Sequence, residues 1–263
     1  MPDPQSPPEK IRVDTANGVT TVTLADVENR NALGAELVQS LFDALARANA
    51  DPSIRAVVLT NEGSTFCAGA NLKEQRKGSG QTGGATFVDV LRAIQTSPTP
   101  VLGRIAGHVV GGGNGLAAAL DIAIAADDVK FGFTEVRLGV APAIISVVCL
   151  PKMRRGEAME VFLRGNRFPA ARAAELGLIA RAVPASELDA AVADVVRDIR
   201  RGGPGALGFA KRLVYEVPAM EQAEAFSWTA RQSAELFAGD EAAEGMTAFL
   251  EKRKPAWADD GKE

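Results

Sequence analysis

The segment VVGGGNGLAAALD, Val109 to Asp121, places three consecutive glycines and a fourth, Gly115, in front of an apolar run. Glycine at this density lets the backbone approach another group closely, because no Cβ stands in the way. The approaching group can be a nucleotide phosphate, a packed helix or the carbonyl oxygen of a reacting substrate. Each possibility makes a different demand on the neighbouring residues.

The spacing of these glycines excludes the common phosphate-binding loops. A Walker A loop needs a lysine and a serine or threonine directly after its last glycine, whereas no lysine follows here before Lys130. A dinucleotide fingerprint needs two residues between its second and third glycines, and only Asn114 separates Gly113 from Gly115. The glycines therefore either allow close helix packing or expose backbone N–H groups to a ligand, and the segment alone does not decide between these.

A second loop, FCAGANLKE, also carries small residues, Ala68, Gly69 and Ala70, after a strand-like segment. Two loops with bare backbone N–H groups can direct two donors at one point. That is the requirement for an oxyanion hole, in which each donor stabilises a developing negative charge by about 3–4 kcal/mol. Helix N-termini act in the same direction through their dipoles.

Few other reactive side chains are available. His108 is the only histidine, so a multi-histidine metal site is excluded and no metal is expected. The two cysteines, Cys67 and Cys149, form no CxxC pattern, and no G-x-S-x-G segment accompanies His108 as a hydrolase would need.

The composition of the chain argues against several classes of binding partner. A chain of 263 residues with a net charge of −4 has no basic stripe, which argues against nucleic acid or an anionic membrane surface as the main partner. The longest nearly apolar stretch, Ala117 to Ala126, contains Asp121 and is too short to span a bilayer. The first ten residues contain no apolar signal segment, and with only two cysteines a cytoplasmic location is expected.

The loops must be held by alternating strands and helices. Asn17-Gly18 predicts a hairpin turn between strands at Ile11–Asp14 and Val19–Leu24. Leucines at 33, 37, 41 and 45 share one helical face. Further strands are expected at 56–60, 100–105 and 122–125, with a helix at 87–94 and an irregular loop at FCAGANLKE. This alternation predicts an α/β core with buried strands.

After Gly202-Gly203-Pro204 the pattern becomes purely helical. We therefore predict three regions: a loose N-terminal tail at 1–10, a core domain at 11–203, and a C-terminal helical segment at 204–263. The apolar faces of the last segment need a partner, either the core or another subunit.

Three segments together resemble the enoyl-CoA hydratase/isomerase, or crotonase-like, family. They are FCAGANLKE, the stretch from His108 through GFTEVRLGVAPAIIS, and the ending EGMTAFLEKRKPAW. The resemblance implies an α/β spiral of β-β-α turns, a C-terminal trimerisation region, and a homotrimer or dimer of trimers. It also implies an acyl-CoA substrate, so that coenzyme A enters as part of the substrate and no separate cofactor is needed.

The resemblance also assigns expected roles to residues. The two oxyanion donors correspond to the N–H groups of Ala70 and Gly112. Residues expected to line the coenzyme A path or to meet its phosphates are Ala68, Asn71, Leu72, Lys73 and Arg30. Phe249 and Lys252 correspond to residues that hold coenzyme A, often across a subunit boundary. For Arg30, Lys73 and Lys252, plain solvation at the surface is the alternative.

Hydration of a 2-enoyl thioester needs a polarised thioester oxygen, an activated water and a proton for Cα. Typical hydratases of the family use two glutamates. One corresponds to Glu135, whose apolar neighbours should raise its pKa. The other falls on Gly115 and is absent; Asn114 beside it can orient a water but cannot take its proton. The dienoyl-CoA isomerases and aryl dehalogenases of the family also use a catalytic aspartate, and the corresponding position here is Ala143. Neither of these reactions is therefore expected.

These features favour an enoyl-CoA hydratase in which Glu135 alone handles both protons. The alternatives are a 3,2-enoyl-CoA isomerase and a catalytically weak paralogue that binds acyl-CoA. The variable stretch from Gln75 to Val88, with KGSGQTGG as a lid, is expected to line the pocket. The length and branching of the acyl group, and whether it carries a second carboxylate, are not predicted.

Overall fold

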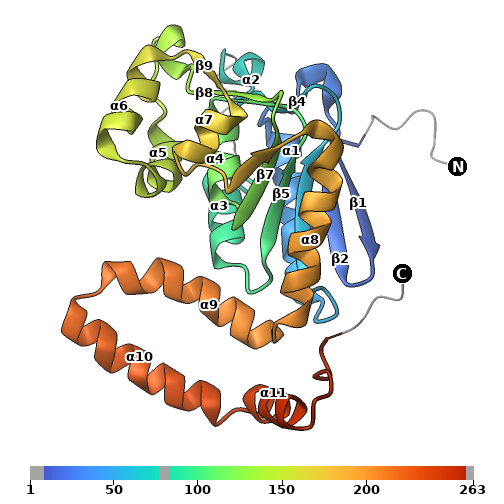
Figure 1. The fold of residues 1–263 in the computed structure, drawn as a ribbon. Helices are drawn as coiled ribbons and strands as arrows, with labels where there is room; N and C mark the ends of the chain where they lie inside the picture. The colour runs from blue at the N-terminus through green and yellow to red at the C-terminus, as the bar shows by residue number, and fades with distance from the viewer. Residues whose placement is uncertain (1–8, 77–82, 259–263) are drawn as a thin grey trace, which may run out of the picture.

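The computed structural model describes residues 9–76 and 83–258. The predicted tail and the predicted lid segment therefore lie largely outside the described residues. Two sheets form the centre of the molecule (Figure 1). The larger sheet has the strand order β1-β2-β3-β5-β7-β10, and the smaller sheet has the order β4-β6-β8-β9.

The chain builds these sheets by repeating one unit three times. Each unit places one strand in the larger sheet, the next strand in the smaller sheet, and then a helix. The strands are β3 (Ala56–Asn61) and β4 (Thr65–Cys67), β5 (Val101–Ile105) and β6 (His108–Val110), then β7 (Ile122–Ala126) and β8 (Lys130–Gly132). The corresponding helices are α2 (Leu72–Arg76) with α3 (Phe87–Thr96), α4 (Gly112–Ala119), and α5 (Ala143–Cys149).

Within each sheet the repeated strands are parallel: β3 pairs with β5 and β5 with β7, while β4 pairs with β6 and β6 with β8. Corresponding loops therefore stack on the same side of the molecule. The expected spiral of β-β-α turns is confirmed. The segment FCAGANLKE was expected to be an irregular loop, but its first two residues belong to β4 and its last three to α2.

The N-terminal part follows its sequence signals. Strands β1 (Ile11–Ala16) and β2 (Val19–Leu24) form the expected hairpin, with Asn17 and Gly18 both at positive φ as a two-residue turn requires. Helix α1 (Ala35–Ala50) buries Leu37, Leu41 and Leu45. Leu33 precedes the helix, so its assignment to the helical face was wrong; it pairs with Ala70 in an isolated bridge instead.

The second half of the chain covers and extends this core. It consists of α6 (Arg155–Arg164), β9 (Arg167–Pro169), α7 (Ala170–Glu175), β10 (Arg181–Val183), α8 (Leu188–Arg201), α9 (Pro204–Glu216), α10 (Gln222–Phe237) and α11 (Asp240–Leu250). Helices α9 to α11 form a layer below the sheets in Figure 1. Several large apolar side chains on this layer are exposed, among them Val214, Phe226, Phe237, Phe249 and Leu250.

Two polar connections hold this layer to the core. Arg55 donates to the carbonyl oxygens of Gly202 and Trp257, at 2.6 and 2.8 Å, which fixes both ends of the helical layer to the start of β3. Lys211 of α9 donates to Asp121 Oδ2 at 2.8 Å and to the carbonyl oxygen of Ile94 at 2.6 Å. Asp121 Oδ2 also accepts from the N–H of Val101, so this pair joins α9, α3 and β5.

We expect Lys211→Ala to lower the free energy of unfolding by about 3 kcal/mol, because it removes the cation that is hydrogen-bonded to the Asp121 carboxylate in a largely buried site. Burial already raises the pKa of Asp121, which Lys211 opposes. Urea denaturation measures the effect. Arg212→Ala is the matched control: its ion pair with Glu216 is exposed, and its loss should cost less than about 1 kcal/mol. Equal losses in the two variants would contradict a special role for the buried pair.

Candidate active site

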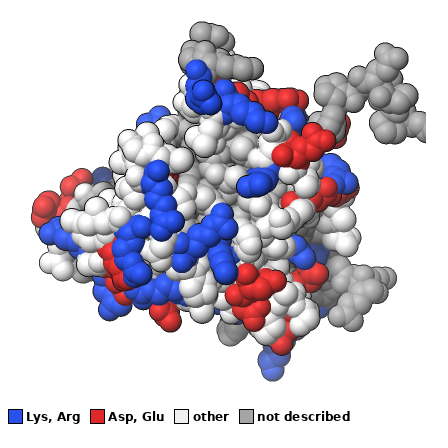
Figure 2. Space-filling view, turned by 90° about the horizontal axis from the view of Figure 1, so that it is seen from above, with Lys and Arg blue, Asp and Glu red and all other residues white. Residues whose placement is uncertain are grey.

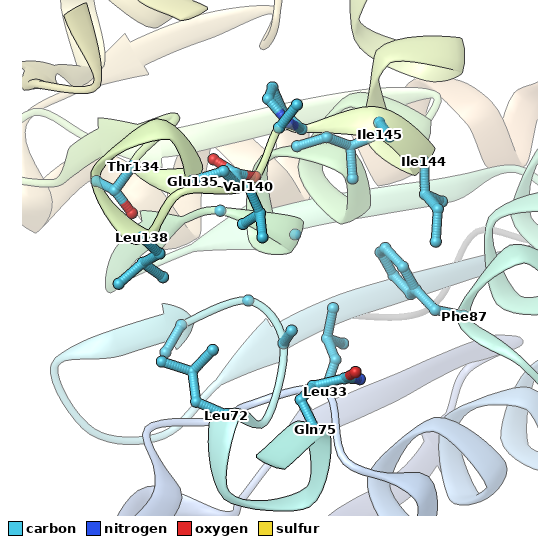
Figure 3. A pocket seen from close by; sticks show the side chains of 18 of the residues that line it. Leu33, Leu72, Gln75, Phe87, Thr134, Glu135, Leu138, Val140, Ile144 and Ile145 are labelled. Carbon is cyan, nitrogen blue, oxygen red and sulfur yellow. The ribbon is translucent and has the colours of Figure 1, made fainter. Parts of the chain in front are cut away.

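A pocket of about 450 Å³ opens where the loops after β4, β6 and β8 meet (Figure 3). Apolar side chains form most of its wall: Leu33, Leu72, Phe87, Val88, Leu138, Val140, Ile144 and Ile145. The backbone of Gly69, Ala70, Gly111 and Gly112 forms another part. Among the described residues that line it, Glu135 is the only one with an ionisable side chain.

The four glycines after β6 have different structural tasks. Gly111 has φ of +55°, which turns the chain from β6 into α4, and Gly112 is the first residue of that helix. A Cβ at Gly113 would lie 3.0 Å from Cys67 Cβ, so this residue permits α4 to pack on β4. Both sequence interpretations therefore hold in part: one pair of glycines shapes the loop at the pocket, while Gly113 and Gly115 allow close packing.

A glycine of the first loop, Gly69, allows the N–H groups of Ala70 and Gly112 to lie close together. Gly69 has φ of +84°, and a Cβ there would lie 2.8 Å from the nitrogen of Gly112. A Cβ at Gly112 would lie 3.8 Å from the nitrogen of Ala70. Within the described part of the chain, neither N–H group donates to another backbone or side-chain group. Both are therefore available to a ligand in the pocket.

The segment NRNAL holds the first of these loops in place. The N–H of Leu33 donates to the carbonyl oxygen of Gly69 at 2.7 Å. The N–H of Ala68 donates to the carbonyl oxygen of Arg30 at 3.1 Å. Asn31 is fully buried at positive φ, and its Nδ2 donates to the carbonyl oxygen of Thr65 at 2.7 Å. Gly69, Leu33 and Asn31 thus shape the site, although they were not among the predicted site residues. The segment NRNAL could have indicated a turn at Asn31, because asparagine tolerates positive φ, but it contains no sign of the contact with Gly69.

Glu135 enters the pocket from a short 3-10 helix, Glu135–Leu138, which follows β8. Its Oε1 lies 3.6 Å from the position of a Cβ at Gly111, which places the carboxylate beside the glycine turn. The Oε2 atom is buried without a hydrogen-bond partner among the described residues. Burial raises the pKa of Glu135 above its ordinary value of 4.5. A carboxylate with one unpartnered oxygen and a raised pKa in an apolar pocket is suited to accept and return a proton.

Two other polar side chains near the loop, those of Asn114 and His108, lie outside the pocket lining. Asn114 is buried and donates to the carbonyl oxygens of Gly111 and Gly132, so it supports the turn and does not line the pocket. His108 Nδ1 accepts from the N–H of Lys130 and also lies outside the pocket lining. Burial raises the pKa of both Cys67 and Cys149 to about 12, which keeps them as thiols.

The structure brings some of the predicted site residues together and leaves others apart. Glu135, Ala70, Gly112, Ala68 and Leu72 all line the pocket. Three others lie nearby outside its lining: Arg30 and Lys73 are exposed, and Asn71 accepts from the N–H groups of Lys73 and Glu74, which caps α2.

Phe249 is in the last turn of α11, and Lys252 follows that helix. In Figure 1, α11 lies at the bottom of the molecule, and α2, α4 and α5 lie above it. Phe249 is 83% exposed, and Lys252 is exposed at positive φ. Neither reaches the pocket of its own chain.

Gly115 has no room for a side chain. It is buried in α4, and a Cβ there would overlap Ile145, lying 2.7 Å from Ile145 Cβ and 3.4 Å from Ile145 Cα. Its φ is not positive, so packing, and not backbone conformation, is what requires glycine here. The missing acid is therefore replaced by the apolar side chain of the next helix.

Comparison with known proteins agrees with this geometry. Residues 14–260 match the family model described as enoyl-CoA hydratase/isomerase. The chain belongs to this family.

Individual relatives are similar over nearly their whole length. Enoyl-CoA hydratase EchA19 of Mycobacterium tuberculosis is 31% identical, with 89% of this chain and 91% of that protein covered. Two solved structures have the same fold: enoyl-CoA hydratase of Mycobacterium smegmatis, with a TM-score of 0.86 and 30% identity, and AtuE of Pseudomonas aeruginosa, with 0.87 and 32%. Each alignment covers 95% of this chain and at least 99% of the other.

Among the described residues, every helix is too short or too polar to span a lipid bilayer.

We expect Gly69→Ala to reduce kcat by about 10²–10³-fold, the usual effect of losing one oxyanion donor, because the added Cβ would cover the N–H of Gly112. Steady-state kinetics on an enoyl-CoA ester measures this. Gly139→Ala is the control: Gly139 has a similar φ of +76°, but a Cβ there meets nothing within 4 Å. If both variants lost activity equally, backbone strain and not the blocked donor would be the cause.

Glu135 should also leave a signature in stability. Because burial raises its pKa in the folded state, its contribution to stability is present below pH 4.5 and is lost as the pH rises through the folded-state value. Glu135→Gln should therefore raise Tm relative to the parent protein at neutral pH, and the difference should shrink as the pH falls toward 4.5. A difference independent of pH would show that the carboxylate's ionisation is not involved.

Proposed function

We propose that this protein is an enoyl-CoA hydratase, a lyase that adds water across the 2,3 double bond of a 2-enoyl-CoA thioester with a single glutamate as acid and base. The observation that carries the proposal is the pairing of two free backbone donors, at Ala70 and Gly112, with the carboxylate of Glu135, whose Oε2 has no partner, in the same apolar pocket. Relatives named as enoyl-CoA hydratases support the same reaction.

In this mechanism the thioester oxygen accepts hydrogen bonds from the N–H groups of Ala70 and Gly112. Glu135 takes a proton from a water molecule while the oxygen of that water forms a bond to Cβ. The π electrons of the double bond then move onto the thioester, which becomes an enolate. The donors stabilise that negative charge. The protonated Glu135 then returns its proton to Cα, which collapses the enolate and restores the carboxylate. Because one residue performs both transfers, both new bonds form on the same face of the substrate.

The coenzyme A portion is proposed to leave the pocket past α2. Figure 2 shows lysine and arginine side chains, with aspartate and glutamate among them, on the face of the molecule seen from above. Arg30 and Lys73 are exposed near α2. Cations here suit the phosphates of coenzyme A.

We also propose that the protein assembles as a homotrimer or dimer of trimers through α9 to α11, so that Phe249 and Lys252 serve the pocket of a neighbouring subunit. The exposed apolar side chains of this layer support assembly. A cytoplasmic location is proposed from the two cysteines, both of which are free.

A second candidate is a 3,2-enoyl-CoA isomerase. The observation that favours it is the single acid, because moving one proton between two carbons needs one base and no bound water. A purely acyl-CoA-binding paralogue is less well supported, since Glu135 and both donors are in place.

Isotope labelling separates these reactions. With crotonyl-CoA in H₂¹⁸O, we expect a 3-hydroxyacyl-CoA product that carries the heavy oxygen. Mass spectrometry detects this product and measures the rate at which it forms. Glu135→Gln should lower its rate by about 10²–10⁴-fold, the usual share of general acid–base catalysis, while leaving affinity for a saturated acyl-CoA nearly unchanged. Conversion of a 3-enoyl-CoA without oxygen uptake, and no reaction of the 2-enoyl ester, would identify the isomerase instead.

A further inference from the structure

Helix α5 approaches α4 closely at Gly115. Gly115 is fully buried and does not itself line the pocket, because Ile145 covers it. Both Cβ and Cα of Ile145 lie within 3.4 Å of the position that a Cβ at residue 115 would occupy. These atoms cannot rotate away as the end of a side chain can, so any residue larger than glycine at 115 would displace the backbone of α5.

The same helix forms one end of the pocket. Ala143, Ile144 and Ile145 are the first three residues of α5, and all three line the cavity. In Figure 3, Ile144 and Ile145 face Phe87 of α3 on the side of the pocket away from Leu72 and Leu138. Ile145 is only 2% exposed, so its position is fixed by packing. The distance between α4 and α5 therefore sets where this apolar end closes.

The side chains that α3 and α5 contribute to this end of the pocket are apolar. Phe87, Val88, Ile144 and Ile145 carry no polar atoms beyond the backbone. The single charge among the described lining residues is the carboxylate of Glu135, which would repel a second carboxylate on the acyl group. An apolar acyl chain can be desolvated here without leaving a polar group unpaired, whereas a charged one cannot.

We propose that the Gly115–Ile145 contact determines the acyl-group specificity of the enzyme. By seating α5 against α4 it sets how long an acyl chain the site accepts, and the apolar lining favours an uncharged one. Ile145 acts directly as the pocket wall, and Gly115 acts as a positioning residue behind it. This inference rests on the proposed function for the identity of the ligand as an acyl-CoA thioester, and it adds which acyl groups are accepted and which residues select them.

The test is a double-mutant cycle with Gly115→Ala, Ile145→Ala and the double variant. Two readouts are used: kcat/KM for crotonyl-, hexenoyl-, decenoyl- and glutaconyl-CoA, and calorimetric Kd values for butyryl-, hexanoyl- and decanoyl-CoA. The saturated esters report acyl selection without turnover, so a failure of the hydratase assignment would leave the specificity test intact.

We expect the parent protein to prefer crotonyl-CoA over glutaconyl-CoA and to show a defined chain-length preference along the saturated series. Ile145→Ala should shift the preference toward the longer chain by about tenfold or more, in the range that pocket methylenes supply. Gly115→Ala should weaken binding of all esters, and Ile145→Ala in that background should restore it, giving strong non-additivity. Val147→Ala is the matched control, since Val147 lies on the same helix, is 73% exposed and does not line this pocket.

Two results would overturn the proposal. One is an Ile145→Ala protein whose Kd values for the saturated series keep the parent's chain-length preference. The other is a double variant whose effects are the simple product of the single ones. If Gly115→Ala alone does not fold, folding of the double variant would itself support the contact, and the Ile145→Ala series still tests the selection.

Discussion

The proposed chemistry depends on the absence of one side chain between two loops. At Gly69 the chain has a backbone conformation that L side chains rarely adopt, and a Cβ at this point would cover the nitrogen of Gly112. Two peptide N–H groups from distant parts of the sequence can therefore face one small space. Peptide donors have fixed directions, so they need no reorganisation when negative charge develops in front of them.

The repeated β-β-α unit explains how two such loops come to lie together. Parallel pairing of β4, β6 and β8 stacks the segments that follow them, which are the Ala70 loop, the glycine turn and the helix that begins with Glu135. The carbonyl oxygen of Gly132 accepts from the N–H of Gly111 and from Asn114 Nδ2, which ties the glycine turn to the end of β8, just before the Glu135 helix. The site is thus a property of strand register as much as of its side chains.

Much of this arrangement could be predicted from the sequence. The hairpin, the buried strands and the change to helices after Gly203 follow from turn residues and hydrophobic periodicity, and the short motifs indicated the family. The roles of single residues were harder. Leu33 fits a helical face by spacing, yet the turn at Arg30 and Asn31 places it before the helix. Asn114 looked suited to orient a water, but its hydrogen bonds are to backbone carbonyls. Such choices depend on contacts between segments far apart in the chain, which local patterns do not contain.

The packing of Gly115 against Ile145 has a consequence for how this site could change over generations. An acidic residue at 115 would meet a helix already occupying its space, while a smaller residue at 145 would first leave a void beside α4. Either order of substitution passes through a less stable protein. A change to a two-acid site at these positions would therefore require residues 115 and 145 to change together.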